Sequence, residues 1–175
     1  MSDQAHGDAR LVEFGERLAN SAAFSGLFRE GMDLVEETAA YLDGPGRVEA
    51  KALDRPASLT YATESMRLTT RLMQLASWLL LHRAVKEGEM TLSQANREKA
   101  KVKLSAPEPA AGDMLLRLPS QLQDLIARSI ELQSRVRRLD ATIHSSHAPS
   151  GERSGGNPLA PQLNRLRAAF ERQTG

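Results

Sequence analysis

A stretch of about thirty residues, 61–90, constrains the fold of this chain more than any other feature. It contains no proline, its first glycine is Gly88, and its residues favour helix throughout, so it predicts one long helix. An apolar arc this wide has to be covered by several elements, within one chain or across a symmetric interface. The stretch therefore predicts an all-α bundle of long helices that forms a dimer. The arc consists of two adjacent stripes, Met66, Thr69, Met73, Ala76 and Leu80 on one and Leu68, Leu72, Leu75 and Leu79 on the other.

Composition narrows the class of protein further. Of the 175 residues, 41% are hydrophobic and only 4% aromatic, so the core depends on Leu, Ala and Met, which favours packed helices over a β-sandwich. The absence of cysteine excludes disulfides, thiolate metal sites and cysteine nucleophiles, and it favours the reducing cytoplasm. No segment resembles a signal peptide or is apolar for long enough to span a bilayer. We therefore expect a cytoplasmic protein with no membrane span.

The charges are distributed unevenly along the chain. Residues 1–60 carry 11 acidic and 6 basic side chains, whereas residues 61–104 carry 4 and 8. An acidic first helix packed beside a basic second helix explains this division without an outside partner. Nucleic acid is a poorer candidate, because the densest basic cluster is short and lacks interleaved aromatic residues. That cluster consists of Arg97, Lys99, Lys101 and Lys103.

Residues 1–9 are expected to be disordered, and a bundle domain is predicted over residues 10–143. A first main helix is expected to begin at a cap on Ser21 and to end at residues 44–46, which read Gly-Pro-Gly. A polar connection, residues 47–55, leads to the long helix, which begins near Pro56 and ends at Gly88.

The second half of the bundle domain contains two further start signals. Thr91 and Gln94 form a capping-box pattern, so a helix resumes there and runs to about Leu104. A third main helix is predicted from about Pro119, because its apolar sites alternate at spacings of four and three. Only Ser129 breaks that alternation. The apolar sites are Leu118, Leu122, Leu125, Leu132, Val136, Leu139 and Ile143.

Beyond the bundle domain the composition changes. Residues 144–158 are rich in Ser, Gly and Pro, which predicts a flexible linker. Residues 159–175 form a tail with an amphipathic motif, in which Leu159, Leu163, Leu166 and Phe170 recur at spacings of four, three and four. Such a motif either docks into a groove of a partner or folds back onto its own bundle, and the pattern favours neither.

Candidate catalytic, cofactor and metal sites are not supported by the residue patterns. His82 could accept a phosphoryl group, but Lys86 lies four residues on and Gly88 six, which differs from the spacing in histidine phosphotransfer domains. A partly buried structural histidine is the better interpretation. His144 and His147 lack carboxylate neighbours, and no phosphate loop, serine nucleophile motif or zinc-helix motif occurs. We therefore expect no enzyme activity, no cofactor and no metal.

A third face of the long helix is a candidate partner surface, with Arg67, Arg71 and Trp78 as its partner-binding residues. Arg and Trp are frequent among binding hot spots. The favoured alternative is that both arginines pair with acidic residues of the first helix and that Trp78 fills the interface. The acidic residues in question are Asp33, Glu36 and Glu37.

Three segments together resemble the RcdA family, the regulators of CtrA degradation, which are bacterial cell-cycle protease adaptors. The segments are FREGMDLVEETAAYLDGPGR (28–47), AKALDRPASLTYATESMRLTTRLMQLASWLLLHRAVKEGEM (50–90) and TLSQANREKAKVKL (91–104). The block YATESMRLTTRLMQLASWLLL is long and unusual, which makes the resemblance specific. It extends over residues 14–104 and more loosely to residue 143.

The resemblance implies a dimeric three-helix bundle that is a non-enzymatic adaptor and helps to deliver cell-cycle regulators to the ClpXP protease. In this family a response-regulator protein primes the unfoldase, and the RcdA-like protein docks on the primed complex. Cargo then arrives directly or through a cyclic di-GMP-binding adaptor. Recruitment to a cell pole is a further expectation.

A flexible tail also fits the family, which makes Leu163, Leu166 and Phe170 candidate partner-binding residues. Three alternatives to the adaptor remain open: a phosphotransfer module through His82, a nucleic-acid binder through the basic cluster at residues 97–103, and a purely structural dimer.

Overall fold

The structure, a computed structural model, describes residues 3–102 and 112–147, with side chains over residues 21–102 and 112–145. This part of the chain contains six helices and no strand, which confirms the all-α prediction. The helices are α1 (Asp3–Asp43), α2 (Pro45–Lys51), α3 (Arg55–Lys86), α4 (Leu92–Lys101), α5 (Gly112–Leu115) and α6 (Ser120–His147). The chain divides into two compact units, Met1–Asp140 and Ala141–Gly175. The contacts discussed below lie within the first unit.

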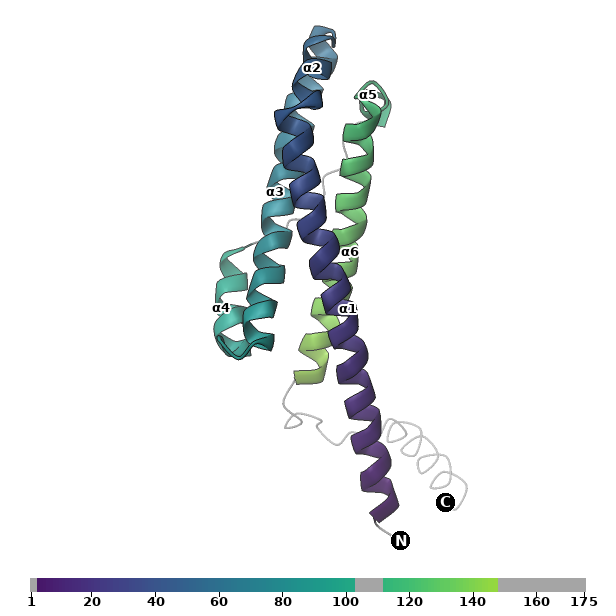
Figure 1. The fold of residues 1–175 in the computed structure, drawn as a ribbon, viewed down its shortest axis with the longest axis vertical. Helices are drawn as coiled ribbons and strands as arrows, with labels where there is room; N and C mark the ends of the chain where they lie inside the picture. The colour runs from purple at the N-terminus through teal and green to yellow at the C-terminus, as the bar shows by residue number, and fades with distance from the viewer. Residues whose placement is uncertain (1–2, 103–111, 148–175) are drawn as a thin grey trace, which may run out of the picture. The chain divides into compact units, whose positions relative to one another are not determined.

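Three long helices, α1, α3 and α6, lie side by side in the first unit (Figure 1). Helix α1 runs antiparallel to both of the others, and α3 and α6 run in the same direction. The parallel pairing is possible because α4 turns back along α3, and α5, which precedes α6, lies at the end of the bundle where α3 begins (Figure 1). The predicted three-helix bundle is confirmed.

The core of the bundle contains the leucine stripes that the spacing predicts. On α3, Leu68, Leu72, Leu75 and Leu79 are buried, and the buried residues of α6 include Leu122, Leu125, Leu132, Val136 and Leu139. Helix α1 contributes Phe24, Leu27, Leu34 and Tyr41. Each buried side chain of this size contributes on the order of 1.5–3 kcal/mol, so these stripes hold the three helices together.

The structure confirms the predicted signals at Pro56, Gly88 and Thr91, and it adds a cap at Asp54. The Asp54 carboxylate caps α3 by accepting from the backbone N–H of Ala57 at 2.9 Å, and Pro56 lies in the first turn. Gly88 follows the helix with a φ of 77°, a conformation that glycine adopts without strain. Thr91 and Gln94 form both hydrogen bonds of a capping box, at 2.9 and 3.1 Å.

Three boundaries differ from the sequence-based expectations. Helix α1 begins at Asp3 and continues through Ser21, so Ser21 does not cap a separate helix. The helix can continue because this stretch contains no proline and because an isolated glycine costs a helix only about 1 kcal/mol. Residues 47–51 are helical in α2, because Pro45 is well suited to a first helical turn. Helix α6 extends to His147, into the start of the predicted linker.

Helix α1 packs beside α3, as the charge division predicts, but the ion pairs that its acidic residues form within the described ranges go to α6. Arg135 bonds Glu30 at 2.6 Å and Arg128 bonds Glu37 at 2.8 Å, so two ion pairs link α1 to α6. The carboxylate of Glu37 raises the pKa of the Arg128 guanidinium above its ordinary value, mainly through a hydrogen bond. The sequence could not assign the partners of Glu30 and Glu37, because both α3 and α6 contain arginines at helical spacing and either helix could supply them.

Replacing Gly46 with alanine is expected to reduce the free energy of unfolding by about 1–3 kcal/mol. A Cβ atom at this position would lie 2.6 Å from the Tyr61 hydroxyl and 2.8 Å from the Tyr41 carbonyl oxygen. The hydroxyl can move, but the carbonyl belongs to the last turn of α1. Thermal and urea unfolding followed by circular dichroism would measure the loss.

Gly26→Ala is the matched control for that substitution. Gly26 lies on an exposed turn of α1, and nothing lies within 4 Å of a Cβ atom there. This variant should therefore be more stable than the wild type by up to about 1 kcal/mol. Equal effects of the two substitutions would contradict the close packing of α2 against Tyr41 and Tyr61.

Candidate interaction surfaces

An uncovered apolar stripe runs along α3. Leu59, Met66, Met73 and Leu80 recur every seven residues, so they lie on one side of the helix, and their side chains are between 52% and 72% exposed. The neighbouring stripe, in contrast, is buried in the core. Of the wide apolar arc that the sequence predicts, the described part of the chain therefore covers only one half. We call the four exposed residues the apolar face.

A shallow apolar groove of about 310 Å³ lies beside the apolar face, between α1 and α3. Its lining residues are Val35, Thr38, Ala39, Leu42, Asp43, Thr69, Leu72, Met73 and Ala76, of which only Asp43 is charged. The Thr38 hydroxyl is buried, and no hydrogen-bond partner for it occurs within the described residues. Together the groove and the apolar face form an apolar surface of the kind that marks protein interaction sites.

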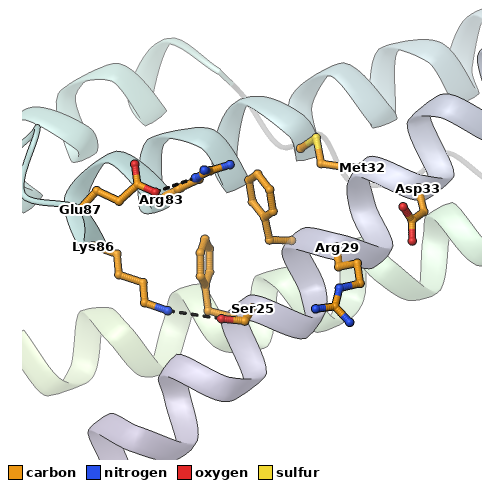
Figure 2. Close-up of a pocket in the computed structure, with 9 residues that line it drawn as sticks. Ser25, Arg29, Met32, Asp33, Arg83, Lys86 and Glu87 are labelled. Atoms are coloured by element: carbon orange, nitrogen blue, oxygen red, sulfur yellow. Dashed lines mark hydrogen bonds and ion pairs between the residues drawn. The ribbon is translucent and has the colours of Figure 1, made fainter.

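A second groove, of about 580 Å³, lies between α1 and the end of α3 and has a different chemistry (Figure 2). We call it the aromatic groove. Its apolar lining consists of Phe24, Phe28 and Met32, and its polar lining of Ser25, Arg29, Asp33, Arg83, Lys86 and Glu87. In Figure 2, Arg83 and Lys86 extend from α3, while Ser25, Arg29, Met32 and Asp33 lie along α1.

Cations lie close to the aromatic rings of this groove. The Arg83 guanidinium lies 5.0 Å from the centre of the Phe28 ring, and the Lys86 ammonium lies 5.7 Å from that of Phe24. Arg83 also bonds Glu87 at 2.9 Å, and this hydrogen bond raises the pKa of the guanidinium. Lys86 donates to the Ser25 hydroxyl at 3.3 Å. The groove is thus an apolar floor with positive groups at its edge.

The face predicted to bind a partner through Arg67, Arg71 and Trp78 is mostly inside the bundle. Trp78 is 1% exposed and Arg71 is 7% exposed, and only Arg67, which pairs with Glu64 at 2.8 Å, reaches the surface. The partners that the structure describes are Glu64 for Arg67 and Ser129 for Arg71, and not the acidic residues Asp33, Glu36 and Glu37 of the first helix. A partner-binding role for Arg67 stays a prediction.

Arg71 reaches from α3 to α6 inside the bundle, and this contact explains why Ser129 interrupts the apolar pattern of α6. Its guanidinium donates a 2.7 Å hydrogen bond to the Ser129 hydroxyl, which donates in turn to the Ile126 carbonyl at 2.7 Å. Burial lowers the pKa of Arg71, and the nearby Glu64 carboxylate acts in the opposite direction. Ser129 is therefore a polar contact for a buried cation.

Trp78 and His82 belong to a polar cluster that joins α3, α4 and α6, which we call the Asp140 cluster. Asp140 accepts a 2.9 Å hydrogen bond from the Trp78 indole and forms a short ion pair with Lys99. The Lys99 ammonium lies 3.3 Å from His82 Nε2, and the centre of the His82 ring lies 4.1 Å from that of Trp78. The cluster holds α4 against the bundle.

These contacts bear on the alternative functions. His82 is buried and contacts Lys99, as expected of a structural histidine and not of an exposed phospho-acceptor. In the basic cluster, Lys99 is paired with Asp140 and Lys101 with Glu98, and Lys103 lies outside the described residues. No group of three or more potential metal ligands occurs over the ranges that the structure describes.

Several predicted features lie outside the described residues. These are Leu163, Leu166 and Phe170 of the tail, most of the predicted linker, and Leu104. The aromatic groove, on the other hand, was missed by sequence analysis. Phe24 and Phe28 have core spacing, and the only signal of a different role is that Arg29 and Ser25 alternate with them on the same helix.

A helical bundle with an uncovered apolar face and a cationic aromatic groove belongs to the class of protein-interaction bundles. No helix in residues 3–102 or 112–147 combines the length and the apolar character that a membrane crossing requires. The chain belongs to the DUF1465 family, described as proteins of unknown function, because the family model matches residues 15–170.

Among solved structures, the crystal structure of RcdA from Caulobacter crescentus CB15 is similar to this chain, with 54% sequence identity and a TM-score of 0.57. The match covers 68% of this chain and 88% of RcdA, which confirms the resemblance seen in the sequence. No curated protein matches the chain.

Proposed function

We propose that this protein is a non-enzymatic adaptor that helps to deliver cell-cycle regulators to the ClpXP protease within a primed adaptor hierarchy. The observation that carries the proposal is the 54% identity to RcdA over 68% of the chain. The interaction surfaces add support, since an adaptor needs sites for partners and no catalytic groups. Its partner is the unfoldase after a response-regulator protein has primed it. Its cargo is a substrate or a cyclic di-GMP-binding adaptor. The site of action is the cytoplasm, including a cell pole.

An adaptor of this kind acts by raising effective concentration. Two weak contacts that are linked through one protein can raise occupancy by on the order of 10²–10⁴ without any new chemistry. Weak surfaces such as the aromatic groove are therefore sufficient, and no residue of the bundle has to take part in a reaction.

The test is the degradation rate of a cell-cycle regulator by reconstituted ClpXP and its priming factor. We expect faster degradation with the full-length protein than without it. A version that ends at Ser146, and one in which Leu163, Leu166 and Phe170 are replaced by serine, should lose part of the effect if the tail contacts a partner. If the full-length protein leaves degradation unchanged across several regulators, the adaptor proposal fails.

The homodimer is also part of this proposal, and the apolar face and the adjacent groove support it. Four large apolar side chains in a heptad-spaced row favour burial against a second helix surface of the same kind. The groove beside them carries a single charged residue, Asp43, so a second copy could cover it at little cost in desolvation.

Met73→Glu is expected to weaken the dimer by about 10- to 100-fold in dissociation constant, because it places a charge in the centre of the apolar face. Analytical ultracentrifugation over a range of concentrations would measure the change. Ser134→Glu, which adds the same charge at an exposed position of α6, is the control and should leave the dimer intact. A monomeric wild type, or equal effects of the two variants, would contradict the assignment of this face.

A further inference from the structure

We propose that the aromatic groove binds an acidic peptide segment of a protein partner, with an aliphatic or aromatic side chain on its floor and carboxylates at its cationic edge. The inference deepens the proposed function by naming the chemistry of one partner, and it rests on that function only in assuming a protein partner. The aromatic groove is distinct from the groove beside the apolar face, whose lining contains a single charged residue, Asp43.

The floor of the groove can accept one large apolar side chain. Phe28 and Met32 are half-buried, so both have surface that a ligand can cover, while Phe24 beneath them belongs to the core. Both phenylalanines line the groove, with their ring centres 6.1 Å apart. A methionine beside two phenylalanines adapts to aliphatic and aromatic groups alike.

The charges at the edge favour an acidic ligand. Among the described residues Arg29 forms no ion pair, and Lys86 bonds only a neutral hydroxyl, at 3.3 Å. Elsewhere on the bundle, Arg128 and Arg135 are each paired with a glutamate of α1. The two carboxylates of the groove do not change this balance, since Glu87 is already paired with Arg83 and Asp33 is a single charge against two cations.

The cations of the groove are open to a ligand that approaches from solvent. Arg83 and Lys86 are exposed and lie beside the rings of Phe28 and Phe24, so a ligand that contacts the rings also meets these cations. A carboxylate of the ligand would bond Lys86 or Arg29 without displacing a carboxylate of the described residues. The tail of the chain itself is a poor occupant, because residues 159–175 carry three arginines and one glutamate.

Fluorescence anisotropy with the full-length protein tests the proposal. The probe is a short fluorescein-labelled peptide with a Leu-Phe pair between glutamates, and the comparison peptide has lysines in their place. We expect the acidic peptide to bind at least tenfold more tightly than the basic one, and its binding to weaken as salt concentration rises. Equal affinities for the two peptides would overturn the proposal.

Variants connect that binding to the groove. The double variant Arg29→Glu/Lys86→Glu should weaken binding of the acidic peptide by at least tenfold and Arg29→Lys should retain it, with circular dichroism confirming the fold. Arg47→Glu reverses a charge on the exposed surface of α2 and should change the affinity less than twofold. If the double variant binds the acidic peptide as the wild type does, the peptide binds elsewhere and the groove assignment fails.

Degradation assays with the wild type, set beside the peptide-binding results, separate the two proposals. Acceleration of degradation by the wild type without any binding of the acidic peptide would overturn the groove proposal and leave the adaptor function standing. Groove-dependent peptide binding without acceleration for any regulator would support the groove and overturn the adaptor function.

Discussion

Replacing Ser129 with leucine is expected to lower the free energy of unfolding by about 3 kcal/mol, although it completes the apolar alternation of α6. The Ser129 hydroxyl is the hydrogen-bond acceptor for the buried Arg71 guanidinium at 2.7 Å. Leucine would leave that cation without its partner in the core and would add volume where the helices already touch. Urea unfolding of the purified variant would measure the loss.

Two further variants identify the cause. Ser134→Leu makes the same substitution at an exposed site of α6 and should change stability by no more than about 0.5 kcal/mol. Adding Arg71→Met to the Ser129→Leu protein should recover at least about 1 kcal/mol, because the buried guanidinium that lost its hydrogen-bond acceptor is then removed. If Ser129→Leu alone were as stable as the wild type, the hydrogen bond between Arg71 and Ser129 would make no net contribution to the free energy of unfolding.

Asp140→Asn is expected to cost about 2 kcal/mol and to loosen α4. Asparagine keeps an oxygen that can accept the hydrogen bond of the Trp78 indole but removes the charge that faces Lys99. The Lys99 ammonium, which is largely buried beside His82, is then left without a counter-charge. Denaturant unfolding would give the loss, and amide hydrogen exchange over Leu92–Lys101 should become faster.

Asp43→Asn provides the control for that prediction. Asp43 pairs with Arg47 at 3.1 Å, but both side chains are well exposed, so the same chemical change should cost no more than about 0.5–1 kcal/mol. Lys99→Met combined with Asp140→Asn should lower the free energy of unfolding by less than the sum of the two single losses. In the double variant the Lys99 ammonium, which Asp140→Asn alone would leave without its counter-charge, is absent. Additive effects, or unchanged exchange in α4, would contradict a role of this cluster in holding α4.

These two substitutions mark the limit of what residue spacing can predict. The position of Ser129 in the sequence shows an interruption but not its cause, because Arg71 lies 58 residues away and meets it only across the bundle. Likewise, Trp78 and His82 share the long helix, but Asp140 and Lys99 reach them from two other helices. Chemistry that depends on long-range contacts cannot be derived from periodicity, which reports only the faces of one element.

The same limit explains the candidate surfaces. Spacing predicts two apolar stripes on α3, but which stripe enters the core and which stays exposed depends on where α1 and α6 pack. The aromatic groove requires residues of α1 to meet the last turn of α3, and no local signal contains both. Arg71 and Trp78 are of residue types that are frequent in binding hot spots, but the packing of α1 and α6 against α3 places both in the interior.

The sequence by itself determined the all-α class, the long helix and most of its end signals, and the leucine stripes of α3 and α6. These follow from local propensity, capping and spacing, which act within a few residues of one another. Only the tertiary structure decided the parallel pairing of α3 with α6, the ion pairs of α1 with α6, the partner of Arg71 and the uncovered apolar face. Each of these depends on which surfaces of distant segments meet, and several arrangements of the same amphipathic helices satisfy the same local pattern.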